Sequence, residues 1–201
     1  MTNSRDRASK TLSWAANLLL LAGVAGVGVW GWSTLRCAVI QSRENRIFDE
    51  RVRGAQPPAS AAPGLEHGAT IGRLAIPRLH LRAMVLEGAG GDTLAVALGH
   101  VPGTALPGQP GNVVIAGHRD ALFRCLRDIS KDDLIVFQTI RGSYTYHVED
   151  TAIVRPRDIA VLASGTHSEM TLITCYPFHY VGSAPDRFIV RARLSDFRGR
   201  V

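Results

Sequence analysis

A long uncharged segment near the amino terminus constrains this chain more than any other feature. The 25 residues from Thr11 to Leu35 carry no formal charge, and tryptophans flank their apolar run. As a helix rising 1.5 Å per residue, the segment spans about 37 Å, which exceeds the roughly 30 Å hydrocarbon core of a bilayer. Indole rings favour the membrane interface. The segment therefore predicts a transmembrane helix at residues 11–35.

Two other interpretations of this segment stay open, a cleaved signal peptide and a buried core helix. A signal peptide has a shorter apolar core and a small-residue cleavage site, whereas Trp30-Gly31-Trp32 is a poor cleavage context. Basic residues flank the segment on both sides, so the positive-inside rule does not decide its orientation. We interpret the segment as an uncleaved signal anchor, with residues 1–10 as a cytoplasmic tail and the body outside.

Composition excludes several classes of protein. A chain of 201 residues has room for one moderate domain plus accessory segments. Its hydrophobic content of 46% is too high for a wholly disordered chain, and three cysteines are too few for a disulfide scaffold. Residues 1–53 hold eight basic and four acidic residues, so +4 of the net charge of +6 lies beside the predicted membrane segment. The remaining +2 gives little support to a nucleic-acid partner.

A juxtamembrane segment and linker at residues 36–67 separate the anchor from a folded body at residues 68–201. The stretch GAQPPASAAPG at 54–64 has three prolines and no charge, which is typical of a linker. The polar stretch 41–53 before it either extends the helix or forms a solvated face. The body is long enough to bury one core.

The body has the pattern of a mainly β domain. Short apolar and β-branched runs alternate with Gly and Pro turns, which favours a barrel or sandwich. Short helices are expected at 92–98 and 121–129. The expected strands are 71–76, 83–86, 112–116, 134–140, 144–148, 151–154, 171–175 and 188–194.

Three residues at strand ends could form a nucleophilic site. Cys175 ends the run TLITC, His118 follows the run NVVIAG, and Arg187 opens RFIVRARL. If strand 171–175 pairs with both other strands, the three side chains converge at one barrel mouth. A thiol needs a base, which His118 could supply, and Arg187 could hold a substrate carbonyl or an oxyanion. Taken singly, each residue is better explained as a buried thiol, a turn histidine and a solvated arginine.

Taken together with their flanking residues, these positions resemble sortases, the membrane-anchored cysteine transpeptidases, and class D most closely. The resemblance rests on GHRD at 117–120, TLITCYP at 171–177 and an arginine twelve residues after the cysteine. It covers the whole chain and implies an eight-stranded sortase β-barrel. By the same resemblance, Cys175 is the nucleophile, His118 the acid/base partner and Arg187 the group that positions substrate and stabilises the oxyanion.

The resemblance also implies a reaction, partners and a location. Sortases cleave an LPxTG-like C-terminal sorting motif between Thr and Gly, form a thioester and transfer the acyl group to an amine, such as wall peptide or a pilin lysine. The partners are then substrate proteins with that motif, the amine acceptor and the lipid bilayer, at the bacterial cytoplasmic membrane. No cofactor and no metal are predicted.

Further residues are assigned more weakly by family placement. Thr174, His100 and Tyr176 are expected near bound substrate, with a purely structural role as the alternative for His100. The segments 155–168 and 176–185 are expected to form two walls of the substrate groove. Cys125 departs from the family pattern and is expected to pack a helix.

Rival functions fail at particular residues. A phosphatase C-x₅-R loop needs arginine at position 181, which is Val181. A papain-like protease has its cysteine before its histidine, the reverse of the order here. A zinc site from His100, His118 and Cys175 lacks paired ligand spacing. Two alternatives remain: a catalytically silent β-barrel that binds wall or peptide ligands, and a sortase-like enzyme that acts mainly as a hydrolase.

Overall fold

The computed structural model describes residues 66–163, 167–180 and 182–199, together with residues 14, 16–29, 31, 32, 35, 39, 42, 45, 46, 48 and 49. The chain divides into two compact units, residues 1–39 and 40–201. In the first unit, residues 16–29 are helical. Within the described residues, no helix combines the length and the apolar character that a membrane crossing requires. The predicted anchor includes positions outside the described residues, and the linker at 54–64 lies wholly outside them.

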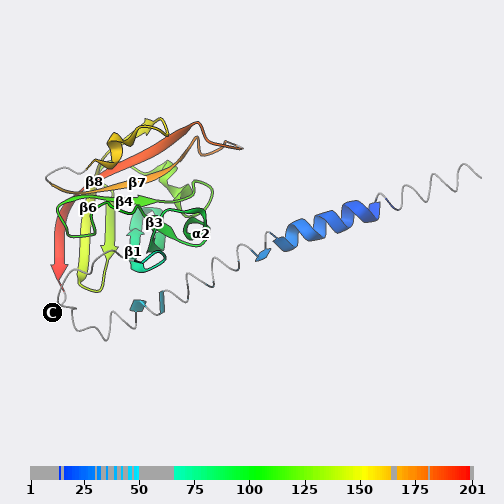
Figure 1. The fold of residues 1–201 in the computed structure, drawn as a ribbon, viewed down its shortest axis with the longest axis horizontal. Coiled ribbons are helices and arrows are strands. Elements are labelled where there is room, and N and C mark those ends of the chain that lie inside the picture. Colours follow the sequence, from blue (N-terminus) through cyan, green and yellow to red (C-terminus); the bar gives the residue numbers. More distant parts are fainter. Residues whose placement is uncertain are drawn as a thin grey trace, which may run out of the picture. The chain divides into compact units, whose positions relative to one another are not determined.

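The second unit is built on a closed eight-stranded barrel, as predicted (Figure 1). Around the barrel the strands follow the order β1-β2-β3-β4-β7-β8-β6-β5. The pairs β2/β3 and β4/β7 are parallel, and the other described pairs are antiparallel. The strands are β1 (Thr70–Ile76), β2 (Leu81–Glu87), β3 (Leu98–His100), β4 (Gly111–Ala116), β5 (Leu134–Gln138), β6 (Gly142–Val154), β7 (Ser168–Tyr176) and β8 (Asp186–Gly199).

Alternation along the strands fills the barrel interior. In β7, Met170 and Leu172 are fully buried, and in β8 their partners Ala192 and Val190 are buried opposite them. This period of two is the strand signature that the sequence displays. The largest fully buried side chains of the described residues are Tyr146, Phe123, Phe137, Leu74, Ile76, Met84, Leu98, Ile115, Leu126, Ile135, Met170 and Leu172.

The helical segments are shorter or tighter than the sequence predicts. The segment expected at 121–129 is the 3₁₀ helix η2 (Leu122–Asp128). Its buried residues Phe123 and Leu126 are three apart, and a helix with three residues per turn places both on one face. The other expected helix is limited to α2 (Gly91–Leu94). Two further 3₁₀ helices, η1 (Pro77–Leu79) and η3 (Ile159–Leu162), occupy connections.

Candidate active site

Three adjacent strands place the predicted catalytic residues at one level of the barrel. Cys175 is the penultimate residue of β7, and Arg187 lies directly opposite it on β8. On the other side of β7, the parallel strand β4 ends where Ala116 pairs with Ile173. His118 follows that end by two residues, so the register carries it to the level of Cys175. Because neighbouring strands are about 4.8 Å apart, the registers bring the three residues together near the carboxyl end of β7.

Cys175 and Arg187 share the outer face of the barrel. Side chains alternate between the two faces of a strand, and Leu172 and Thr174 on the inner face of β7 are 0% and 2% exposed. Cys175 therefore points outward, where it is half-buried, as is Arg187. A peptide lying across the outer face of β4, β7 and β8 can reach this thiol.

The backbone before His118 is fixed by β7. The amide of Gly117 donates to the carbonyl of Ile173 at 3.1 Å, and Thr174 Oγ1 donates to the carbonyl of Gly117 at 2.8 Å. A Cβ at position 117 would lie 2.6 Å from the ring of Phe123, so this close packing requires glycine. Thr174, expected near the substrate, is thus placed on the inner face with its hydroxyl proton committed to Gly117.

The His118 side chain is exposed at the start of the turn that leads into η2. Its backbone carbonyl accepts hydrogen bonds from the amides of Ala121 at 3.4 Å and Phe123 at 3.1 Å. The imidazole has no hydrogen-bond partner within the described part of the chain. The turn is therefore held by the backbone, which leaves both ring nitrogens open for proton exchange.

Arg187 is oriented by the connection that precedes it. Its Nη1 donates to the carbonyls of Ala184 at 3.4 Å and Asp186 at 3.0 Å. Its Nε and Nη2 have no acceptor among the described residues, so these donors remain open to an incoming carbonyl oxygen. The side chain is both held in place and chemically available.

An aromatic cluster closes the barrel next to the cysteine. Tyr176 and Phe178 have ring centroids 6.0 Å apart, and Phe178 lies 5.3 Å from Phe188 on β8. Tyr176, expected near the substrate, therefore lies directly after Cys175 as part of this cluster. The cluster attaches the start of the β7–β8 connection to the core.

The connection between β6 and β7 is attached to the barrel through Asn112 of β4. Asn112 Nδ2 donates to the carbonyl of Val161 at 3.1 Å, and Asn112 Oδ1 accepts a hydrogen bond from Thr171 at 2.9 Å. Both polar side chains are 3% exposed. Thr171 faces outward like Cys175, and a cavity of about 300 Å³ lies here. The described part of the segment predicted as a groove wall thus lies, at Val161, on the same outer face as the thiol.

His100 is buried at 2% exposure, away from the surface. Its Nδ1 lies 2.6 Å from a carboxylate oxygen of Glu87, and its Nε2 lies 3.0 Å from the carbonyl oxygen of Ala105. Both ring nitrogens therefore have protein partners. Of the two roles that the sequence left open for His100, this arrangement favours the structural one.

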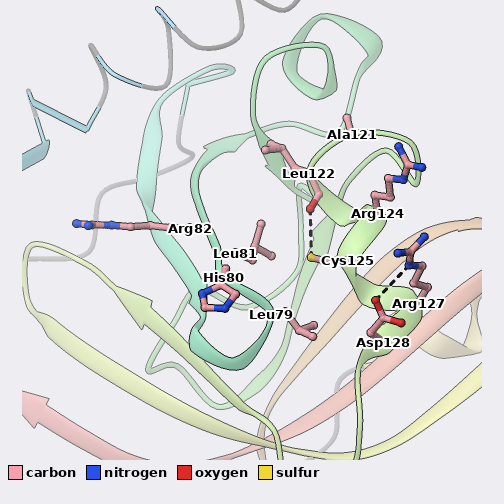
Figure 2. A pocket seen from close by; sticks show the side chains of 10 residues that line it. All are labelled: Leu79, His80, Leu81, Arg82, Ala121, Leu122, Arg124, Cys125, Arg127 and Asp128. Atoms are coloured by element: carbon pink, nitrogen blue, oxygen red, sulfur yellow. Dashed lines mark hydrogen bonds and ion pairs between the residues drawn. The ribbon is translucent and has the colours of Figure 1, made fainter.

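Cys125 lies on η2 and lines a pocket of about 470 Å³ between η2 and the turn before β2 (Figure 2). Its Sγ donates weakly to the carbonyl of Leu122 at 3.6 Å. Burial raises the pKa of this thiol, which disfavours the reactive thiolate. Leu79 and Leu81 line the pocket with it. Within the described residues, no group of three or more His, Cys, Asp or Glu side chains could hold a metal ion.

Sequence reasoning assigns no role to Arg119, although this residue is part of GHRD. Arg119 Nη2 donates to the carbonyls of Tyr180 at 2.7 Å and Gly182 at 2.9 Å, in the connection between β7 and β8. Its position next to His118 was the available signal. Asn112 was also missed, because it appears as one polar residue at the start of an apolar strand.

The structure is thus a closed β-barrel that carries an outward-facing cysteine opposite an arginine at the end of a strand, an arrangement suited to an enzyme with a cysteine nucleophile. The model of the family described as Sortase domain matches residues 74–195. The chain therefore belongs to the sortase family, whose members are cysteine transpeptidases.

Similarity to individual proteins supports the same family and its class D. The chain is 35% identical over 137 residues to Sortase D of Bacillus subtilis (strain 168), with 68% of each chain covered. It resembles the structure of a Clostridium perfringens Sortase D5 transpeptidase, with 29% identity, a TM-score of 0.60, and 66% of this chain and 82% of that chain covered. It also resembles the SrtA sortase from Actinomyces oris, with 28% identity, a TM-score of 0.62, and 73% and 89% covered.

Proposed function

We propose that this chain is a membrane-anchored sortase that cleaves an LPxTG-like C-terminal motif and transfers the acyl group to an amine. The observation that carries the proposal is the register of three strands. Cys175 on β7 pairs directly with Arg187 on β8. On the other side of β7, His118 follows the end of the parallel strand β4 at the same level as Cys175.

The first step forms a thioester. The Cys175 thiolate attacks the carbonyl carbon of the motif's threonine, the bond to the glycine nitrogen breaks, and the protonated His118 gives its proton to the leaving amine. The negative charge that develops on the carbonyl oxygen is stabilised by donors already in place. Arg187 Nε and Nη2, which have no acceptor among the described residues, are suited to that task.

The second step transfers the acyl group. An amine, from wall peptide or a pilin lysine, attacks the thioester carbonyl, the carbon–sulfur bond breaks, and Cys175 is regenerated as the thiolate. His118 accepts the proton that the attacking amine loses. Transfer prevails over hydrolysis when the acyl group and the amine exclude water from the site.

We also propose that residues 11–35 anchor the enzyme in the bacterial cytoplasmic membrane, with the barrel outside the cytoplasm. The uncharged run of 25 residues and its flanking tryptophans support this placement. The partners are then substrate proteins bearing the sorting motif, an amine acceptor and the lipid bilayer. Neither a cofactor nor nucleic acid is assigned.

Intact-mass measurement after an acid quench tests the reaction directly. With an LPxTG-containing peptide, the wild-type protein should gain the mass of the acyl fragment, whereas Cys175→Ala should gain nothing. Cys125→Ala is the matched control and should be acylated like the wild type. Identical behaviour of wild type and Cys175→Ala would contradict the proposal. With an amine acceptor, the product should be the new amide; hydrolysis alone would instead identify a hydrolase.

A further inference from the structure

Arg119 joins the turn after β4 to the connection between β7 and β8. One nitrogen, Nη2, donates to the carbonyls of both Tyr180 and Gly182, at 2.7 Å and 2.9 Å. Its guanidinium carbon also lies 5.8 Å from the centroid of the Tyr180 ring. Hydrogen bonds from a charged donor are stronger than neutral ones. The residue next to His118 therefore holds a segment that begins two residues after Cys175.

The β7–β8 connection depends on side chains for its position. Among the described residues 177–180 and 182–185, backbone–backbone hydrogen bonding is limited to the amide of Tyr180 and the carbonyl of Pro177, at 3.4 Å. Arg187 Nη1 holds the far end of the connection through Ala184 and Asp186. Arg119 holds its middle. Without Arg119, little among these residues would fix the connection over the outer face.

The Arg119 guanidinium also has a second terminal nitrogen, Nη1, that makes no hydrogen bond within the described residues. This nitrogen is buried. Buried polar groups without a partner are rare in folded proteins, and each calls for an explanation. Because Nη1 is enclosed by the protein, an incoming peptide does not reach it, and the guanidinium acts by holding the connection through Nη2.

We propose that Arg119 is a positioning residue of the sortase reaction. It fixes the β7–β8 connection as a wall of the peptide groove and so sets the affinity for the sorting peptide. This inference rests on the proposed function. Arg119 does not touch the reacting thiol, so its loss acts on peptide binding and leaves the intrinsic reactivity of Cys175 in place.

The test compares Arg119→Gln with Arg124→Gln. The Arg124 side chain is exposed on η2 and has no hydrogen-bond or ion-pair partner among the described residues, so Arg124→Gln removes the same charge without removing such a contact. We expect Arg119→Gln to raise KM for the sorting peptide about ten-fold or more, with kcat within about three-fold. The rate at which iodoacetamide alkylates Cys175, followed by peptide mass mapping, should stay within about two-fold of the wild-type rate in Arg119→Gln, because this small reagent does not need the peptide groove. Arg124→Gln should match the wild type in KM, in kcat and in the rate of Cys175 alkylation.

Hydrogen exchange gives a readout that needs no catalysis. Amides in the described parts of 177–185 should exchange faster in Arg119→Gln than in Arg124→Gln. An unchanged exchange rate, an unchanged KM, or a loss of alkylation parallel to the loss of turnover would each overturn the inference. Failure of the proposed function would be distinct, because it would appear as missing acylation of the wild-type protein. The exchange measurement would then still test whether Arg119 holds the β7–β8 connection.

Discussion

At the residue scale, the two faces of β7 have separate tasks. Thr174 faces the interior and donates to the carbonyl of Gly117, while its neighbour Cys175 faces outward. The strand that presents the thiol therefore also fixes the peptide unit that precedes His118. The common level of the thiol and the imidazole is set by backbone register and core packing, which are more rigid than contacts between exposed side chains.

Substitution of His118 or Arg187 should lower the catalytic rate for different reasons, because one removes an acid/base group and the other removes an oxyanion donor. Loss of an acid/base group costs about 10²–10⁴-fold in rate, and loss of an oxyanion donor about 10²–10³-fold. We expect losses of these sizes in kcat/KM for His118→Ala and Arg187→Ala, respectively, with unchanged thermal unfolding.

Two matched controls separate these roles from general effects. His147→Ala removes an exposed histidine from β6, and Arg82→Ala removes an exposed arginine from β2. Both controls should retain most of the activity, measured with a fluorogenic sorting peptide. Near-wild-type turnover of either test variant would refute the role assigned to that residue.

At the element scale, a buried carboxylate connects the β1–β2 turn with the chain before β5. Arg78 of η1 contacts Asp133 through Nε and, at 2.6 Å, through Nη2. Asp133 also accepts the amide of Ser130 at 2.8 Å. These contacts hold η1 beside the start of β5, so they stabilise the barrel on the β1–β5 side.

This carboxylate predicts a pH-dependent term in stability. The Arg78 hydrogen bond holds the pKa of Asp133 below its usual value. The stabilisation is therefore full above the unfolded pKa of about 3.9 and is lost as pH falls through the lower folded pKa. The difference in free energy of unfolding between wild type and Asp133→Asn should be constant near neutral pH and shrink below about pH 4.

Urea denaturation at stepped pH measures this difference. Asp132→Asn is the matched control, since Asp132 is an exposed neighbour whose positive φ of 69° asparagine also tolerates. A wild-type minus Asp133→Asn difference that persists unchanged at acid pH would show that the ion pair contributes no such term.

Elements with strong local patterns could be predicted from the sequence. The runs at 112–116 and 171–175 combine β-branched residues with turn signals, and both are strands. β3 was missed because its three residues, Leu98–His100, are too few to show a period. The helix η2 was expected, but its 3₁₀ winding follows from packing of Phe123 and Leu126 rather than from propensity.

The candidate site was predictable only where its residues stand at strand ends. Cys175 and His118 could be aligned because each follows a recognisable strand. Arg119 could not be given a role, since its partners are backbone carbonyls 61 and 63 residues further along the chain. Any residue type supplies a carbonyl, so such contacts leave no pattern in the sequence. The same holds for Asn112 and the carbonyl of Val161.

At the scale of the whole molecule, residues before the barrel belong to its compact unit. Arg73 on β1 is 6% exposed and donates to Asp49 at 2.9 Å and to Gln138 at 2.8 Å. Phe48 is 3% exposed, and its ring centroid lies 5.2 Å from the Arg73 guanidinium carbon. The stretch 41–53 is therefore not solvated at Phe48. A buried charge needs such partners, because an unpaired one is costly.

The contact between Phe48 and Arg73 lies far from the candidate active site, so its effect on stability can be separated from any effect on catalysis. β1 is four strands away from β7 in either direction around the barrel, so Phe48 packs on the side opposite Cys175. Phe48→Ala should therefore lower the free energy of unfolding by about 1.5–3 kcal/mol while kcat/KM of the folded enzyme stays unchanged. Urea denaturation and peptide kinetics on the full chain measure both, with the exposed Arg46→Ala as control. An equal loss of stability in Arg46→Ala, or a fall in kcat/KM in Phe48→Ala, would contradict the prediction that Phe48 stabilises the barrel without affecting the active site.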